Sequence, residues 1–182
     1  MNKFKHLAQA TLGLTLALLM AHTALAESAT TPALQGQIVR VSDGDTVTLQ
    51  SETGNLKIRL AGIDAPESRM PHGQEAKAHL AAMVLGKEVQ AIVHKKDRYG
   101  RTIATLMLNT KDVNLAMLKA GMAWHYKQYE REQSKDQASA YSQSEQLART
   151  QGVGLWQLEM PIPPWEWRHI RANATKNAQS KS

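Results

Sequence analysis

Three segments near the start of the chain alternate apolar and polar residues, and this alternation constrains the fold more than any other feature. Because successive side chains of a strand point to opposite faces, the pattern predicts three half-buried strands, QIVRVS (37–42), DTVTLQS (45–51) and LKIRLAGI (56–63). Gly54-Asn55, between the second and third segments, is a signal for a two-residue hairpin turn. With the turn centred there, Asp45 is expected to face Asp64.

The rest of the chain mixes helical and strand patterns. Apolar residues at helical spacing predict a helix over 73–86, and two further helices are expected over 112–121 and 134–151. Alternation returns over 87–94 and 101–108, which gives two more strands. We expect a β-barrel with helices (α+β), an OB-type five-stranded Greek-key barrel with about three helices. Such barrels commonly bind oligonucleotides on one face.

The first 26 residues have the three-part pattern of an export signal. Lys3 and Lys5 form a basic start, ATLGLTLALLMA is a short apolar run, and small residues end at Ala26. The alternative, a membrane helix, needs about 20 apolar residues, and threonines, a glycine and His22 interrupt this run. We therefore expect an exported protein, periplasmic or secreted, without stable membrane association once the signal is removed.

Removal of 26 of the 182 residues leaves 156, a length that is typical of one domain. We expect a signal peptide over 1–26, a flexible lead-in over 27–34 and the OB domain over 35–157. A Pro/Trp segment and a disordered basic tail are expected to fill 158–182, because RANATKNAQSKS has little apolar surface to bury. Trp165 and Trp167 are expected to pack the tail against the barrel or the helices.

The formal net charge of +6 falls to +4 without Lys3 and Lys5. This balance favours an acidic partner, although it also fits ordinary solubility. The absence of cysteine excludes disulfides, thiolate zinc sites, a cysteine nucleophile and a lipoprotein anchor. Nothing in the sequence suggests an obligate interface, so a monomer is expected.

Two aspartates would meet at one end of the predicted hairpin. Asp45 and Asp64 would repel each other there unless a cation lies between them or one carboxyl is protonated. Calcium binds carboxylate, carbonyl and water oxygens, so the backbone carbonyl of Ala65 could contribute to the same shell. Strict alternation places Arg59 and Asp64 on opposite faces of the strand. The site therefore requires an irregularity such as a bulge at Gly62.

Charged residues next to these aspartates suit phosphate chemistry. Arg59 lies on a barrel strand and Arg101 follows a glycine turn, and guanidinium groups bind phosphate through paired hydrogen bonds. Glu67 is not needed for the metal and could orient or deprotonate a water molecule. Each residue also has an ordinary explanation by itself, such as a surface acid or an arginine whose stem lies on apolar neighbours.

Five motifs occur together and in this order: SDGDTV, IRLAGIDAPE, GQEAK, DRYGR and GLW. Through these motifs, the chain resembles the thermonuclease (staphylococcal nuclease-like) family over roughly residues 37–156. The resemblance implies an OB barrel and a calcium-dependent endonuclease that hydrolyses DNA and RNA with low sequence specificity. Its products would have 3′-phosphate and 5′-hydroxyl ends. Its substrates would be single-stranded DNA, double-stranded DNA and RNA.

By the same resemblance, the calcium ligands are Asp45, Asp64 and the carbonyl of Ala65, and the catalytic residues are Arg59, Glu67 and Arg101. The family's DTPE or DCPE is DAPE here, which changes only a side chain beside a backbone ligand. The candidates for substrate binding are Arg98, Tyr99, Tyr126 and Tyr129. Whether Tyr126 or Tyr129 stacks on a base is open, as is the role of Glu67 as a base or as a water anchor.

A non-catalytic OB module that binds single strands or another polyanion is the alternative function. The barrel and the net charge alone require no chemistry. A degenerate binding module would be expected to lack Asp45, Arg59, Glu67 or Arg101, and this chain has all four. The sequence therefore favours the nuclease.

Overall fold

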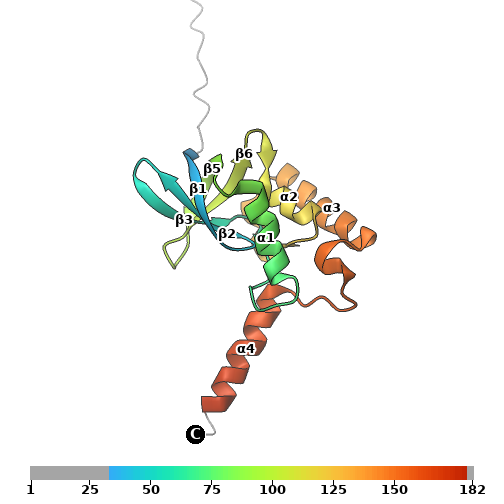
Figure 1. The fold of residues 1–182 in the computed structure, drawn as a ribbon. Coiled ribbons are helices and arrows are strands. Elements are labelled where there is room, and N and C mark those ends of the chain that lie inside the picture. Colours follow the sequence, from blue (N-terminus) through green and yellow to red (C-terminus); the bar gives the residue numbers. More distant parts are fainter. Residues whose placement is uncertain (1–32, 180–182) are drawn as a thin grey trace, which may run out of the picture.

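Five strands close into a barrel in the computed structural model, which describes residues 33–179 (Figure 1). The predicted export signal and nearly all of the lead-in lie outside the described residues. Neighbouring strands follow the order β3-β2-β1-β5-β6, and a parallel β3–β6 pairing closes the circle. The strands are β1 (Ala33–Asp43), β2 (Thr46–Ser51), β3 (Gly54–Leu60), β5 (Glu88–Lys96) and β6 (Thr102–Leu108). The predicted five-stranded OB-type barrel with helices is confirmed.

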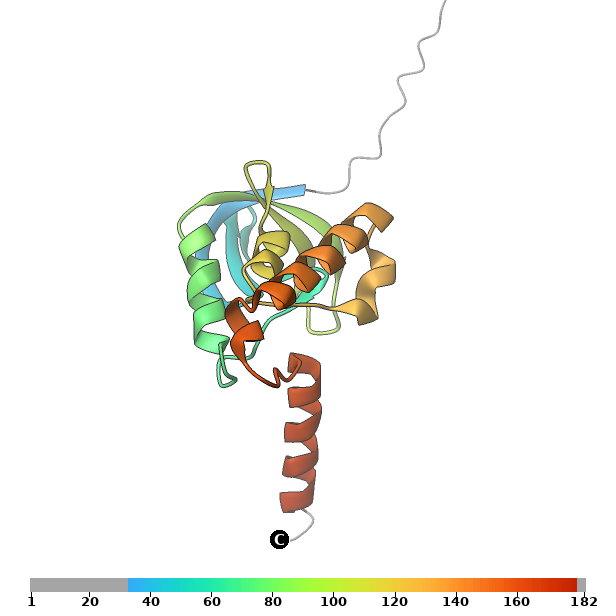
Figure 2. The same ribbon diagram turned by 90° about the vertical axis from the view of Figure 1, so that its right-hand side faces the viewer.

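Helices cover the barrel on two sides, with α1 on one side and α2 and α3 on another (Figures 1 and 2). The helices are α1 (Gly73–Val84), α2 (Val113–Lys119), α3 (Lys135–Gln151) and α4 (Pro164–Gln179), with short 3₁₀ helices η1 (Lys127–Glu132) and η2 (Gly154–Gln157). Short strands complete the fold: β4 (Ile63–Asp64) pairs with β8 (Trp124–His125), and β7 (Lys111–Asp112) pairs antiparallel with the end of β6. Within residues 33–179, no helix is both long and apolar enough to cross a bilayer.

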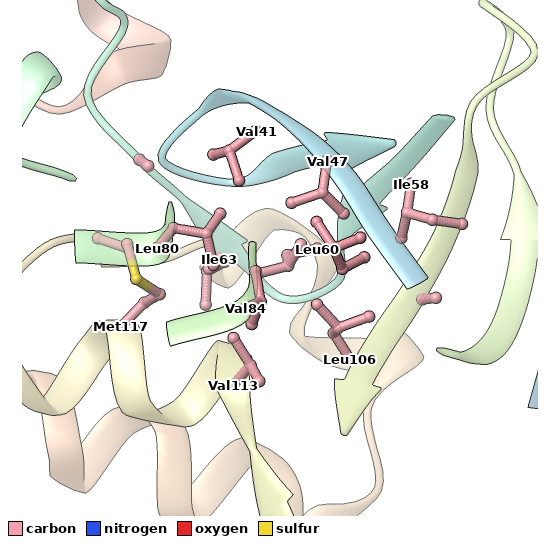
Figure 3. Packing of buried hydrophobic residues seen from close by; sticks show 14 of the residues in the cluster. Val41, Val47, Ile58, Leu60, Ile63, Leu80, Val84, Leu106, Val113 and Met117 are labelled. Carbon is pink, nitrogen blue, oxygen red and sulfur yellow. The ribbon is translucent and has the colours of Figure 1, made fainter. Parts of the chain in front are cut away.

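The core fills the barrel and the space beneath the helices (Figure 3). Val47, Ile58 and Leu106 point inward from the strands, while Leu80 of α1 and Met117 of α2 point toward them from the covering helices. All five side chains are fully buried. Burial of apolar surface stabilises the folded state by about 25 cal/mol per Å². This core therefore supports the rim of the barrel.

The hairpin register differs from the predicted one. The turn is formed by Glu52 and Thr53, so that Ser51 pairs with Gly54 and Thr46 pairs with Arg59. The predicted register paired Leu49 with Leu60, whereas Leu49 pairs with Leu56. This shift is an even number of residues, so it leaves every side chain on the same face of the sheet. Alternation is therefore equally compatible with both registers, and the prediction that Asp45 faces Asp64 across the ladder is wrong.

The C-terminal segment is helical where a disordered tail was expected. Helix α4 begins at Pro164, a favourable first residue for a helix, and continues through residues of good helix propensity such as Arg168, Ala172 and Lys176. From residue 168 to residue 177 the helix is exposed. Figures 1 and 2 show it projecting away from the barrel, with only its first turns near the rest of the molecule.

Candidate active site

Asp45 lies in the turn between β1 and β2 and is 6% exposed. Its backbone N–H donates to Oδ1 of Asp43 at 3.1 Å, which shapes the turn. Its own Oδ1 accepts from the Thr46 hydroxyl at 3.0 Å, and its Oδ2 accepts from the backbone N–H of Ala65 at 2.7 Å. The bond to Ala65 joins the β1–β2 turn, which holds Asp45, to the chain segment just after Asp64.

Gly44 permits this close approach. A Cβ atom at this position would lie 2.7 Å from Cβ of Ala65 and 2.8 Å from Cβ of Ala76 in α1. Both distances are shorter than carbon atoms tolerate without movement. The glycine in SDGDTV therefore lets the β1–β2 turn, the segment after β4 and helix α1 meet at one end of the barrel.

The predicted irregularity at Gly62 is present as a turn between β3 and β4. Gly62 has φ of 70°, which a residue with a side chain adopts only under strain. The turn breaks the alternation, so Arg59 and Asp64 reach the same place although regular pleating would separate them. Nη2 of Arg59 lies 2.7 Å from Oδ1 of Asp64.

A buried asparagine on α2 fixes this turn. Nδ2 of Asn114 donates to the carbonyl of Ala61 at 2.9 Å and to that of Ala104 at 3.3 Å. Its Oδ1 accepts from the backbone N–H of Leu106 at 3.1 Å. Asn114 is 0% exposed, and its bonds to Leu106 and Ala104 are buried, whereas its bond to the carbonyl of Ala61 is partly buried. It therefore connects β6 with the segment that leads to Asp64.

Arg59 joins the two aspartates. Its Nη1 lies 2.6 Å from Oδ2 of Asp45 while its Nη2 contacts Asp64, and its side chain is 11% exposed. The two carboxylates thus meet at one guanidinium and not across the hairpin ladder. Nη1 is at ion-pair distance but lacks hydrogen-bond alignment, so within residues 33–179 it has no hydrogen-bond acceptor. Nη1 is shielded from solvent, and its close contact is the carboxylate of Asp45.

Burial and nearby charges act in opposite directions on this pair. Burial raises the pKa of the Asp45 carboxyl above its ordinary value, Arg59 opposes the rise, and the carboxylates of Asp43 and Asp64 add to it. Although burial disfavours the guanidinium charge, Asp45 and Asp64 raise the pKa of Arg59. Arg59 therefore stays charged, and the carboxylates around it favour additional positive charge.

Glu67 lies on the loop between β4 and α1, with a side chain that is 43% exposed. Its carboxylate faces Arg168, a residue of α4 that the sequence did not indicate. Nη1 of Arg168 donates to Oε1 of Glu67 at 3.0 Å and to Oδ1 of Asp64 at 3.2 Å, and Nη2 donates to Oδ2 of Asp64 at 2.7 Å. Although burial disfavours its charge, Asp64 and Glu67 raise the pKa of Arg168.

Trp165 packs the start of α4 against the molecule, as expected for this segment. Its ring is stacked on that of Tyr126, with centroids 5.3 Å apart and planes 7° from parallel. It also contacts Trp124 of β8 edge to face, with centroids 5.6 Å apart. Residues three apart lie on the same side of a helix, so Trp165 places Arg168 over the rim. The spacing shows that Arg168 shares the side of α4 that Trp165 packs, but it does not indicate that Arg168 contacts Asp64.

Arg101 is placed apart from this cluster. Its Nε lies 2.7 Å from Oδ2 of Asp97, and its guanidinium lies over the Tyr99 ring. Nη2 of Arg98 donates to the Tyr99 hydroxyl at 2.8 Å. Arg101 immediately precedes β6, and Ile103 of that strand pairs with Arg59. The DRYGR loop therefore lies beside the strand of Arg59, but the contacts of Arg101 are within its own loop.

The two candidate tyrosines have different surroundings. The backbone N–H of Tyr126 donates to the carbonyl of Gly62 at 2.9 Å, which places Tyr126 beside the Asp64 turn. Burial, together with the charge of Asp64, raises the pKa of Tyr126. Tyr129 is more exposed and lies edge-on to Tyr126, with Nζ of Lys95 over its ring. Tyr126 is thus the one adjacent to the carboxylate cluster.

The cluster suits a hard cation in its donor atoms. Within residues 33–179, no three acid or histidine side chains converge closely enough to form a metal site by themselves. Asp45 and Asp64 offer carboxylate oxygens at one end of the barrel, the donor type that calcium prefers. The positive guanidinium of Arg168 lies between Asp64 and Glu67, which shows that a cation is stabilised there. The residues fit a calcium ion whose shell is completed by a backbone carbonyl and water.

An OB barrel with carboxylates and arginines at its rim presents the groups that bind a metal ion and a phosphate ester. A family model described as staphylococcal nuclease homologue matches residues 57–158. The chain therefore belongs to the staphylococcal nuclease family, and it is a nuclease of the hydrolase class. The resemblance seen in the motifs is confirmed.

Curated relatives agree with this assignment. An uncharacterized endonuclease of Haemophilus influenzae is 41% identical over 133 residues, which cover 72% of this chain and 71% of the relative. Micrococcal nuclease of Shigella flexneri is 35% identical over 150 residues, covering 78% of this chain and 84% of the relative. Staphylococcal-like nuclease CAN1 of Arabidopsis thaliana is 46% identical over 113 residues, covering 62% of this chain but only 33% of that longer protein.

Proposed function

We propose that this nuclease is calcium-dependent and hydrolyses DNA and RNA with low sequence specificity, leaving 3′-phosphate and 5′-hydroxyl ends. The observation that supports the proposal best is the convergence of Asp45 and Asp64 on Arg59, with Glu67 on the adjoining loop. These are the residues that the family resemblance assigns to metal and catalysis. Single-stranded DNA, double-stranded DNA and RNA are the proposed substrates of a monomeric enzyme.

Asp45 and Asp64 would hold the calcium ion, with the carbonyl of Ala65 as a third ligand. The backbone N–H of Ala65 donates to Oδ2 of Asp45, which holds this residue beside the proposed ion. A bound calcium ion would supply positive charge beside a phosphoryl oxygen and so stabilise charge that develops in the transition state. Because both carboxylates are buried, the charges there act in a medium of lower effective dielectric than water.

Arg59 would bind the scissile phosphate and stabilise the negative charge that develops on it. The side chain is 11% exposed, and its guanidinium would share its positive charge between the two carboxylates and a phosphate oxygen. The guanidinium is preorganised by two carboxylates, so little reorganisation is needed as the reaction proceeds. Its pKa lies above about 12 in its ordinary state and is raised further here, so Arg59 does not act as the proton donor.

Glu67 would position the attacking water or accept its proton as the 5′-oxygen leaves. Its side chain is 43% exposed, so water reaches its carboxylate. Arg101 would place a second guanidinium on the phosphate. To do so, it must first exchange its ion pair with Asp97 for the phosphate. Arg98 and Tyr99 on the same loop would contact neighbouring nucleotides, since the Tyr99 ring is well exposed. Tyr126 and Tyr129 remain candidates for base stacking.

The apolar run and small residues near the start of the chain support export, with cleavage after Ala26. We propose that the mature enzyme acts in the periplasm or outside the cell. The lack of cysteine is compatible with an oxidising compartment.

The test is digestion of single-stranded DNA by purified residues 27–182 in calcium and in chelator, with identification of the product ends. The proposal predicts cleavage in calcium, loss of cleavage in chelator and 3′-phosphate products. The variant Asp64→Asn should lose most of the activity, because it removes one carboxylate charge from the proposed ion. Cleavage that is unaffected by chelator would refute the calcium mechanism. DNA that is bound but stays intact would indicate the non-catalytic binding module.

A further inference from the structure

The start of α4 covers the carboxylates of the candidate site. Arg168 contacts both oxygens of Asp64 and one oxygen of Glu67 at distances of 2.7 to 3.2 Å. Paired hydrogen bonds between a guanidinium and a carboxylate are strong and directional. The side chain of Arg168 is 42% exposed, so this contact lies at the mouth of the site and not in its interior.

Arg168 occupies the part of Asp64 that a metal ion needs. Oδ1 of Asp64 accepts from Arg59 and from Arg168, and Oδ2 accepts from Arg168. An ionised carboxylate has about four lone-pair sites, and three of them are engaged in this way. A divalent cation also repels a guanidinium at this distance. Coordination by Asp64 therefore requires Arg168 to move.

The charge balance of the rim leads to the same conclusion. When all three are ionised, Asp45, Asp64 and Glu67 carry three negative charges, and Arg59 neutralises one of them. Arg168 supplies the second positive charge from outside the barrel. With Arg168 withdrawn, the four remaining side chains have a net charge that matches a divalent cation.

The attachment of α4 is narrow, which makes withdrawal feasible. Trp165 is stacked on Tyr126 and edge-on to Trp124, and these contacts fix the first turn. Beyond the first turns the helix is exposed, and both ribbon views show it extending into solvent (Figures 1 and 2). The segment that leads into it has Met160 84% exposed. Elements with few buried contacts open at low free energy.

We propose that α4 is an autoinhibitory cover, in which Arg168 is an internal cation that competes with calcium for Asp64 and Glu67. This inference rests on the calcium dependence proposed above. The aromatic contacts of Trp165 keep Arg168 in place when calcium is scarce. Binding of calcium displaces the first turn of α4, and the exposed carboxylates and Tyr126 then become accessible to a nucleic acid.

The size of the effect follows from the population of the covered state. When only the open state binds calcium, the apparent dissociation constant equals the intrinsic one divided by the open fraction. Minor conformational states are typically populated at about 0.1–10%, and the upper end of that range makes apparent binding about tenfold weaker. Removal of Arg168 should therefore tighten calcium binding by about tenfold.

The test is calorimetric titration of calcium into residues 27–182 without nucleic acid, for the wild type, Arg168→Ala and Trp165→Ala. We expect Arg168→Ala to bind calcium about tenfold more tightly, and Trp165→Ala to bind it more tightly as well, because its helix start is no longer held. Arg171→Ala is the matched control: it removes the same charge from the exposed part of α4 and should leave the affinity unchanged. Hydrogen exchange should show calcium-induced loss of protection in residues 164–170 of the wild type.

Each outcome decides between the proposals. Calcium affinity that is equal in the wild type and Arg168→Ala, or lower in Arg168→Ala, would overturn the cover while leaving a calcium-dependent nuclease intact. A gain in affinity that Arg171→Ala shares would also overturn it, because net charge alone would explain the result. Absence of calcium binding in every variant, Arg168→Ala included, would refute the proposed calcium dependence itself and with it the cover.

Discussion

Asn114→Ala removes the side chain that fixes the turn before Asp64. In the variant, the carbonyl of Ala61 loses its donor at 2.9 Å, and the N–H of Leu106 loses its acceptor at 3.1 Å. The carbonyl of Ala104 keeps the backbone N–H of Ala61 at 2.8 Å, so it is not left unpaired. One buried backbone N–H, that of Leu106, and one partly buried carbonyl, that of Ala61, therefore lose their partners.

Each buried polar group without a partner destabilises the folded state by about 1–3 kcal/mol. The N–H of Leu106 falls in this range and the partly buried carbonyl of Ala61 adds less, so the two together give about 2–4 kcal/mol. Small movements or a water molecule in the vacated space reduce the loss, so we expect about 3 kcal/mol. This is a large part of the roughly 5–15 kcal/mol that is typical of a folded domain. The effect should also reach catalysis, because the same turn positions Asp64.

The assay is urea unfolding followed by tryptophan fluorescence, which gives the free energy of unfolding of each variant. Asn55→Ala is the matched control, since it makes the same chemical change at an exposed position of β3 and should alter stability by less than about 0.5 kcal/mol. Asn114→Asp should be at least as harmful as Asn114→Ala, because a carboxylate would face the carbonyls of Ala61 and Ala104. If the free energy of unfolding of Asn114→Ala falls by less than about 1 kcal/mol, Asn114 does not fix the turn as described, because neither backbone group would be left unsatisfied.

Two further predictions concern the elements around the site. Gly44→Ala should lower the free energy of unfolding by about 1–3 kcal/mol, because the new Cβ would lie 2.7 Å from Cβ of Ala65; thermal unfolding measures this, and an unchanged melting temperature would contradict it. Hydrogen bonds from Arg101 and Tyr99 outweigh burial and lower the pKa of Asp97, so its stabilisation is present above the ordinary value of 3.8 and is lost as the pH falls through the folded-state pKa. Asp97→Asn should therefore flatten the acid side of the stability curve measured by urea unfolding, whereas parallel curves for the two proteins would show that Asp97 contributes nothing to it.

The barrel was predictable because its strands alternate apolar and polar residues. The site residues were predictable because their motifs occur together in one order. The need for an irregularity at Gly62 also followed from the sequence, since alternation separates Arg59 from Asp64. The hairpin register did not follow from the sequence, because shifts by an even number of residues preserve the buried face. Gly54 has a positive φ at the start of β3, while Glu52 and Thr53 form the turn, residues that carry no strong turn signal.

The part played by α4 could not be predicted for a different reason. Arg168 lies 104 residues from Asp64 in the sequence, and no local pattern relates the two. Trp165 was expected to pack against the domain, but the pattern did not indicate which surface it would cover. The low apolar content of the tail suggested disorder, whereas helix propensity and an anchored first turn are sufficient for α4.

The measurement that tests the catalytic role of the rim most directly is the turnover number on single-stranded DNA in saturating calcium for the wild type, Glu67→Gln and Glu132→Gln. The two glutamates are equally exposed, at 43%, and each pairs with a basic residue, so Glu132→Gln controls for loss of a surface carboxylate. A positioned acid or base contributes about 10²–10⁴-fold. We predict that the turnover number falls by at least about 10²-fold in Glu67→Gln and changes little in Glu132→Gln. Turnover by Glu67→Gln close to that of the wild type would contradict the assignment of catalysis to this rim.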